Sequence, residues 1–218
     1  MRTRRARLVV FDLDGTLVDS SRDLATAVNR ALQRVAPGTP ALPEGMVRSF
    51  IGSGARVLIT RSLAYAGLAR PVDEVLPVFL EAYRSCLLET TQLYPGTVEV
   101  LDRLRDRPLA VLTNKPGDMS RAILEGLGVA DRFFRIYGAG DVEARKPDPG
   151  GLVRIASEAA VKARDTVMVG DSSIDVCTGR AAGAFTVGVT YGFDSDSFRE
   201  DPPDLFVSRL TDLPDRLS

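Results

Sequence analysis

The chain of 218 residues contains no histidine. Catalysis by Ser-His-Asp or Cys-His groups is therefore excluded, and so are the common zinc sites that use imidazole ligands. Any acid–base chemistry must be carried out by carboxylates or by lysine. This absence restricts the chemistry of the protein more than any other feature of its composition.

Cysteine and long apolar runs are also scarce. Cys86 and Cys177 are the two cysteines of the chain, which is too few for a disulfide framework. No run reaches the roughly 18 apolar residues of a membrane span. The basic stretch Met1–Arg7 is followed by the apolar run Leu8–Phe11, which is too short for the core of a signal peptide. We therefore expect a cytoplasmic protein.

An excess of charge of either sign is absent as well. The formal net charge is −1, so no global field attracts nucleic acid or an anionic membrane. Any attraction for a charged substrate must be local, and we expect a small molecule as partner rather than nucleic acid or a membrane. The sequence leaves the oligomeric state open between monomer and homodimer.

Near the N-terminus an apolar strand ends in two carboxylates. Val9-Val10-Phe11 leads into Asp12 and Asp14, and Gly15 follows. Side chains two residues apart in a strand share a face, so these acids can converge on one metal ion or phosphoryl group. Paired acids at a strand end also form turns with Asx caps, so the pair alone does not define a site.

The segment between residues 20 and 92 has apolar residues at helical spacing and no alternating strand pattern. We predict helices over residues 20–35, 44–50, 55–66 and 71–90. Ser20 and Asp23 are expected to cap the first of these helices as a pair. Pro77 is expected to kink the last helix or to make it restart.

From residue 93 onward, short apolar strands alternate with helices. We predict strands over residues 109–113, 134–137, 167–169 and 185–189, and an edge strand over 205–207. This alternation is typical of a parallel sheet covered by helices on both faces. In such sheets ligands bind beyond the carboxyl ends of the strands.

Further polar residues follow the later strands. One strand ends in Thr113-Asn114-Lys115, and another ends in Gly170-Asp171 at the start of a helix, with Asp175 four residues after Asp171. Lys146 stands next to a proline that fixes the local backbone. Each feature has a structural alternative, because threonines end strands, lysines lie on surfaces and acids cap helix N-termini.

Together these pieces resemble the four motifs of the haloacid dehalogenase superfamily of aspartyl-phosphate hydrolases, in the same order and approximate spacing. The first motif, DxDGT, is matched by Asp12, Asp14, Gly15 and Thr16. The resemblance implies that Asp12 is the nucleophile and that Asp14 is the general acid and base.

The resemblance also implies a metal cofactor and a phosphate site. Hard oxygen ligands indicate Mg²⁺, and the implied ligands are an Asp12 carboxylate oxygen, the Asp14 backbone carbonyl and Asp171. Asp175 is expected to support Lys146 or a metal-bound water. The groups expected to stabilise the phosphoryl oxygens are Lys146, Thr113 and the backbone amide of Asn114.

In this superfamily a helical cap lies between the first and second motifs, where residues 20–92 fall. We therefore predict an α/β fold with a Rossmann-like parallel sheet sandwiched by helices, formed by residues 1–19 plus 93–218. Residues 20–92 are predicted to form an inserted all-helical cap domain. A cap that closes over the site excludes water and selects the substrate.

The cap sequence resembles that of bacterial phosphoglycolate phosphatases, in which an arginine precedes a hydrophobic-Gly-x-Gly-Ala turn. Here Arg48 precedes Ile51-Gly52-Ser53-Gly54-Ala55. The resemblance implies hydrolysis of 2-phosphoglycolate to glycolate and phosphate. Arg48 is a candidate for pairing with the substrate carboxylate, and it is equally compatible with a surface position beside a glycine turn. Lys115 either contacts the substrate or pairs with an acid, and its role is left open.

Several alternatives share the core residues. Other small-metabolite phosphatases, pyrophosphatases and β-phosphoglucomutase-like phosphotransferases of the superfamily differ in the cap alone. A receiver-type signalling module also carries a phosphoryl-accepting aspartate, but it has no helical cap, and the acid Asp14 would destroy its signal. A haloacid dehalogenase needs neither Asp14 nor a metal. We therefore predict a Mg²⁺-dependent phosphomonoesterase that acts through an aspartyl-phosphate.

Overall fold

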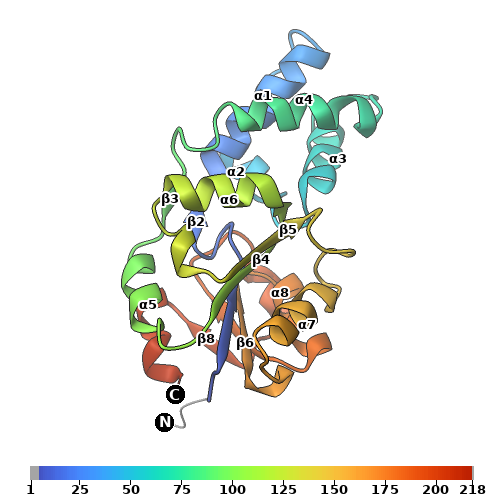
Figure 1. Ribbon diagram of the computed structural model, residues 1–218. Helices are drawn as coiled ribbons and strands as arrows, with labels where there is room; N and C mark the ends of the chain where they lie inside the picture. Colours follow the sequence, from blue (N-terminus) through green and yellow to red (C-terminus); the bar gives the residue numbers. More distant parts are fainter. Residues whose placement is uncertain (1–4, 218) are drawn as a thin grey trace.

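A six-stranded parallel sheet forms the centre of the computed structural model, which describes residues 5–217 (Figure 1). The strand order is β5-β4-β1-β6-β7-β8, and all neighbouring strands run parallel. The strands are β1 (Leu8–Phe11), β4 (Leu109–Pro116), β5 (Arg135–Ala139), β6 (Thr166–Gly170), β7 (Phe185–Val189) and β8 (Leu205–Val207). The predicted α/β fold is confirmed.

The sheet is covered on both faces, and β1 shows why its sequence is apolar throughout. Val9 and Phe11 belong to the hydrophobic cluster on one face, whereas Leu8 and Val10 belong to the cluster on the other. Alternate side chains of a strand point to opposite faces, so a strand buried on both sides needs an uninterrupted apolar run.

Four helices cover the two faces of the sheet. The first cluster receives side chains from α5 (Thr97–Arg103) and α6 (Gly117–Gly126), and the second from α7 (Gly150–Glu158) and α8 (Ser173–Ala182). Short 3₁₀ helices complete the connections at Ala130–Arg132, Ala163–Asp165, Ser195–Arg199, Leu210–Asp212 and Pro214–Arg216. Of the helices in the described part of the chain, none has both the length and the apolar content to cross a membrane.

Four further helices gather at one end of the sheet (Figure 1). They are α1 (Ser21–Val35), α2 (Glu44–Arg48), α3 (Ala55–Tyr65) and α4 (Val72–Arg84). Their apolar faces form a third cluster that includes Val28, Ile59 and Phe79. A two-stranded antiparallel sheet of β2 (Val18–Asp19) and β3 (Gln92–Leu93) lies where the chain enters and leaves this helical group. Neither strand has a counterpart in the sequence prediction.

The predicted capping pair at the start of α1 is wrong. Ser20 makes no side-chain capping hydrogen bond and donates instead to Asp14 Oδ1 at 2.5 Å. Asp23 accepts hydrogen bonds from the amides and hydroxyls of Thr90 and Thr91. Both side chains are engaged in tertiary contacts instead of capping their own helix.

The last helix of this group differs from its prediction in two ways. It ends at Arg84 rather than near residue 90, because Asp23 holds Thr90 and Thr91 in the returning segment. It also runs unbroken through Pro77, so the predicted restart does not occur. Pro77 stands near the beginning of the helix, where the carbonyl that loses its partner belongs to the exposed Asp73.

Candidate active site

The strands that carry the predicted site residues are neighbours in the sheet. β1 lies between β4 and β6, and the chain fills the sheet in opposite directions from β1, which makes this edge a topological switch point. Asp12 follows β1, Asp171 follows β6, and the segment Thr113-Asn114-Lys115 lies in the last part of β4. The structure therefore brings the predicted groups to one edge of the sheet.

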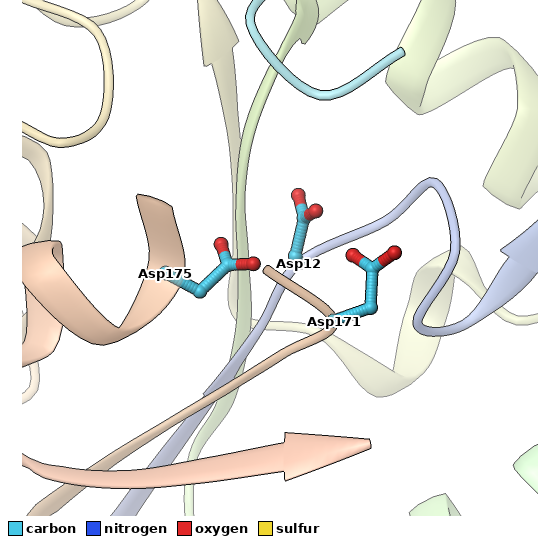
Figure 2. Close-up of side chains that lie close together, drawn as sticks. All are labelled: Asp12, Asp171 and Asp175. Atoms are coloured by element: carbon cyan, nitrogen blue, oxygen red, sulfur yellow. The ribbon is translucent and has the colours of Figure 1, made fainter. Parts of the chain in front are cut away.

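Three buried carboxylates converge there. Oxygen atoms of Asp12, Asp171 and Asp175 all lie within 4.8 Å of one another. In Figure 2 the Asp12 and Asp171 carboxylates stand side by side, and Asp175 points toward Asp12 from the start of α8. The turn after β1 permits this approach only with glycine, because Gly15 has a φ of 84° and an added Cβ would lie 2.2 Å from Asp171 Oδ2.

One lysine stands between two of these acids. Lys146 Nζ lies 2.8 Å from Asp12 Oδ1 and 2.6 Å from Asp175 Oδ1. Burial by itself lowers the pKa of Lys146, but the charges of Asp12 and Asp175 outweigh it and raise the pKa above its ordinary value. The ammonium group is therefore charged.

Both carboxylate oxygens of Asp175 accept hydrogen bonds. Its Oδ1 is paired with Lys146, and its Oδ2 accepts the amide and the hydroxyl of Ser172 at 3.2 and 2.8 Å. The contact with Ser172 forms a capping box at the start of α8. This geometry matches the supporting position expected for Asp175.

The pKa values of the other two acids are raised. Burial raises the pKa of Asp12 to about 6, against the opposing effect of Lys146. Burial, followed by the charges of Asp175 and Asp12, raises the pKa of Asp171 well above its ordinary value. Three carboxylates share one ammonium group, so the site has an excess of negative charge that a divalent cation would neutralise.

The donor set fits such a cation. Asp12 is buried, and its Oδ1 faces the ammonium group of Lys146 at 2.8 Å. Asp171 is oriented through Oδ2, which accepts the amides of Phe193 and Asp194 at 2.6 and 3.3 Å. Carboxylate oxygens held in this way are hard ligands of the kind that Mg²⁺ prefers.

Asp14 occupies a second, separate pair with Lys115. Its Oδ1 accepts hydrogen bonds from Lys115 Nζ at 2.9 Å and from Ser20. Lys115 Nζ also lies 2.6 Å from the hydroxyl of Tyr83, a buried residue of α4. Of the two alternatives left open for Lys115, the structure shows the pairing with an acid.

The contact with Tyr83 is absent from the sequence prediction. An aromatic residue at helical spacing is typical of a helix core, so nothing in the local pattern distinguishes it. Burial raises the pKa of Tyr83 to about 12, so its hydroxyl stays protonated. Burial lowers the pKa of Lys115, but Asp14 and Tyr83 raise it above its ordinary value.

The end of β4 supplies polar groups beside Asp12. Its pairing with β5 is interrupted between Leu112 and Pro116, so the amides of this segment lie beyond the regular ladder. Thr113 is buried and accepts the Lys115 amide at 3.3 Å. The Asn114 side chain donates to the carbonyls of Gly52 and Lys146 at 3.1 and 3.0 Å, which ties the strand end to the segment before α3.

A small cavity lies between the strand ends and the helical group. Its volume is about 40 Å³, whereas one water needs about 10–15 Å³. Its walls combine site residues with apolar side chains of α1, α3 and α4. The lining residues are Asp12, Asp14, Leu24, Ile51, Gly52, Gly54, Ala55, Leu58, Phe79, Leu80, Tyr83, Thr113, Asn114, Lys115 and Pro116.

Arg48 lies outside this lining. Its guanidinium group donates to the carbonyl of Gly192 at 3.2 Å and lies 4.8 Å from the centre of the Phe193 ring. Because the Phe193 amide binds Asp171, Arg48 connects α2 to the loop that orients this acid. Its pairing with a substrate carboxylate stays a prediction.

The fold and the acidic site define a hydrolase class. The family profile of haloacid dehalogenase-like hydrolases matches residues 9–189, a range that contains all three carboxylates of the cluster. The chain therefore belongs to the haloacid dehalogenase-like hydrolases, and it is an enzyme of that family.

Within this family the chain is similar to phosphoglycolate phosphatases. It is 37% identical over 213 residues to the phosphoglycolate phosphatase of Yersinia pseudotuberculosis, with 95% of this chain and 91% of the relative covered. It is 37% identical over 219 residues to phosphoglycolate phosphatase 1 of Pseudomonas aeruginosa, with 97% and 79% covered. A crystal structure of a predicted phosphoglycolate phosphatase from Haemophilus somnus matches with a TM-score of 0.90, 30% identity and 96% of each chain covered. The resemblance seen in the motifs is confirmed.

Proposed function

We propose that the protein is a Mg²⁺-dependent phosphatase that hydrolyses 2-phosphoglycolate to glycolate and phosphate through an aspartyl-phosphate on Asp12. The observation that carries the proposal is the convergence of the buried Asp12, Asp171 and Asp175 carboxylates within 4.8 Å of one another, beside the single ammonium group of Lys146. Buried acids gathered around one cation call for a further positive charge, which a metal ion supplies.

The reaction needs two acids in different roles. An Asp12 carboxylate oxygen forms a bond to phosphorus while the bond from phosphorus to the leaving-group oxygen breaks, and Asp14 gives its proton to that oxygen. A water then attacks the phosphorus of the aspartyl-phosphate, Asp14 takes the proton, and phosphate leaves with Asp12 restored.

The contacts of Asp14 support this division of roles. Its Oδ1 is fixed by Lys115 and Ser20, which leaves Oδ2 to reach the leaving group. Asp12 directly follows β1 and is paired with Lys146. The two acids are therefore held by separate partners, so each is oriented independently of the other.

The metal would be held by an Asp12 carboxylate oxygen, the Asp14 backbone carbonyl and Asp171. Bound Mg²⁺ would neutralise the negative charge that the phosphoryl group adds to a site already rich in carboxylates. Asp175 is assigned to the support of Lys146, because hydrogen bonds engage both of its oxygens. Lys146, Thr113 and the Asn114 amide are assigned to the phosphoryl oxygens.

The choice of substrate is supported by the relatives. Phosphoglycolate phosphatases of Yersinia and Pseudomonas are similar along nearly the whole chain. We assign residues 20–92 to a cap domain and residues 1–19 plus 93–218 to the core.

A phosphate-release screen tests the proposal. The purified protein is assayed against 2-phosphoglycolate, hexose phosphates, pyrophosphate and a generic aryl phosphate, each with Mg²⁺ and with a chelator. We expect the highest kcat/KM with 2-phosphoglycolate and loss of activity with the chelator. Faster hydrolysis of pyrophosphate or a hexose phosphate would contradict the substrate, and activity that survives chelation would contradict the metal.

A further inference from the structure

Lys115 is the sole cationic side chain among the described residues that line the cavity. Lys146 faces the acidic cluster instead, and Arg48 contacts Gly192 and Phe193. Arg145 approaches from outside, where a Cβ added to Gly54 would lie 3.1 Å from its guanidinium group. A negatively charged leaving group inside the cavity therefore meets one cation.

The ammonium group of Lys115 has a donor to spare. A lysine has three N–H donors, and the hydrogen bonds to Asp14 Oδ1 and to the Tyr83 hydroxyl use two of them, with the Tyr83 ring centre 4.6 Å from Nζ. The side chain lines the cavity and is 3% exposed, so its remaining donor is shielded from bulk water. A charged hydrogen bond formed in such a place is strong, because little water competes for it.

The position of Lys115 also suits one class of substrate. Asp14 is the group assigned to the leaving-group oxygen, and Lys115 Nζ lies 2.9 Å from Asp14 Oδ1. In a 2-phosphoglycolate molecule a single carbon separates the leaving-group oxygen from the carboxylate. Because Lys115 Nζ is adjacent to Asp14, a carboxylate on that carbon is within reach of Lys115 once the leaving-group oxygen is placed at Asp14.

We infer that Lys115 binds the carboxylate of the substrate and so selects phosphate esters that carry a carboxylate on the phosphorylated carbon. The inference rests on the proposed phosphatase function. The third donor of Lys115 binds the carboxylate, while Tyr83 and Asp14 fix the direction of the ammonium group. Lys115, in the last part of β4, then takes the carboxylate-binding role that the sequence prediction gave to Arg48.

The test compares two substrates of matched size. One is 2-phosphoglycolate, and the other is 2-hydroxyethyl phosphate, in which a neutral CH₂OH group replaces the carboxylate. Lys115→Met removes the ammonium group, and Lys115→Gln removes its charge but keeps a hydrogen-bond donor for Asp14. Arg48→Met is the matched control for loss of a cation outside the cavity.

The ratio of kcat/KM for the two substrates is the measured quantity, because damage to Asp14 slows both reactions and cancels in the ratio. We expect both Lys115 variants to lower the preference for 2-phosphoglycolate by about tenfold or more. Arg48→Met is expected to leave the preference unchanged. Equal losses on both substrates, or a loss of preference in Arg48→Met alone, would overturn the inference.

A binding measurement covers the case in which the Lys115 variants lose all turnover. Calorimetry with Mg²⁺ compares Asp12→Asn with Asp12→Asn/Lys115→Gln, after circular dichroism has shown that both are folded. We expect the double variant to lose affinity for 2-phosphoglycolate by about tenfold or more and to keep its affinity for 2-hydroxyethyl phosphate. Unchanged affinity for 2-phosphoglycolate would overturn the inference. If the wild-type protein hydrolyses neither ester but cleaves other phosphates, the proposed substrate is wrong instead.

Discussion

Lys146 and Lys115 are both buried beside carboxylates of the site, yet they connect different parts of the molecule. Lys146 joins Asp12, which follows β1, to Asp175 in the first turn of α8, so both of its charged partners belong to the sheet and the helices that cover it. Lys115 joins Asp14 to Tyr83, which belongs to α4 in the helical group. One lysine completes a cluster within the sheet edge, and the other bridges the sheet edge and the helices.

The two lysines therefore differ in how far their contacts depend on the helical group. The ion pairs of Lys146 do not involve α1 to α4, so the pairing of the proposed nucleophile with its lysine does not depend on these helices. The contacts of Lys115 are complete only while α4 covers the site. The proposed general acid Asp14 is therefore the group whose orientation depends on the helices.

The largest effect is expected for Asp12→Asn. The amide keeps the shape of the side chain but removes the nucleophilic oxygen, so turnover of 2-phosphoglycolate should fall by at least about 10³-fold. Phosphate release measures the loss, and circular dichroism checks that the fold is intact. Near-normal hydrolysis by a folded Asp12→Asn variant would remove Asp12 from the role of nucleophile.

The next effect is expected for Lys146→Met, which breaks the cluster at the sheet edge. Loss of a preorganised cation should lower kcat by about 10²- to 10³-fold. Asp12 and Asp175 also lose a shared buried partner, which should cost about 3–5 kcal/mol in the free energy of unfolding. Arg154→Met, which removes an exposed cation that is also paired with an acid, serves as the control. Wild-type stability in Lys146→Met would mean that the ion pairs do not hold the cluster together.

A smaller effect is expected for Tyr83→Phe, which tests the bridge to the helices. The variant removes one hydrogen bond to Lys115 but leaves its pair with Asp14, so kcat/KM should fall by about two- to tenfold. Tyr65→Phe is the matched control, because Tyr65 is 51% exposed on the neighbouring helix α3. If both variants retain full activity, Tyr83 does not contribute to the orientation of Asp14.

The smallest effect on activity is expected for Asp23→Asn, which changes the junction between the two regions but not the site. The buried Asp23 carboxylate accepts the amides and hydroxyls of Thr90 and Thr91, and its loss should cost about 1–3 kcal/mol of stability. Turnover should stay near the wild-type value. Denaturant unfolding measures the cost, and Asp73→Asn, at an exposed ion pair, is the control.

The stability cost of Asp23→Asn should depend on pH. Burial raises the pKa of Asp23, but the hydrogen bonds from Thr90 and Thr91 outweigh it and hold the pKa below its ordinary value. A carboxylate with a lowered pKa in the folded state stabilises the protein above its unfolded pKa of about 3.9. The difference between wild type and variant should therefore be full at neutral pH and shrink as the pH falls below about 4. A difference that grows in acid would contradict this account.

Much of the sheet follows from local sequence. The apolar run of residues 185–189 predicts β7 with its observed bounds, Phe185–Val189, because turn residues bound a strand that is buried on both faces. The two-residue strands β2 and β3 are too short to show an alternating pattern. The end of α4 was beyond prediction because an acid from α1 holds Thr90 and Thr91, and helix periodicity carries no information about such a partner.

The sequence by itself determined which chemistry is available and where along the chain it lies. Without histidine, carboxylates and lysine must act, and three strands end in polar residues at carboxyl ends that meet at one edge of a parallel sheet. Only the tertiary structure decided which lysine pairs with which acid. Lys115 and Asp14 are 101 residues apart, and Lys115 and Tyr83 are 32 apart. Spacing rules describe neighbours within a turn of helix or along a strand, so pairs of this kind exist only once helices and sheet have packed together.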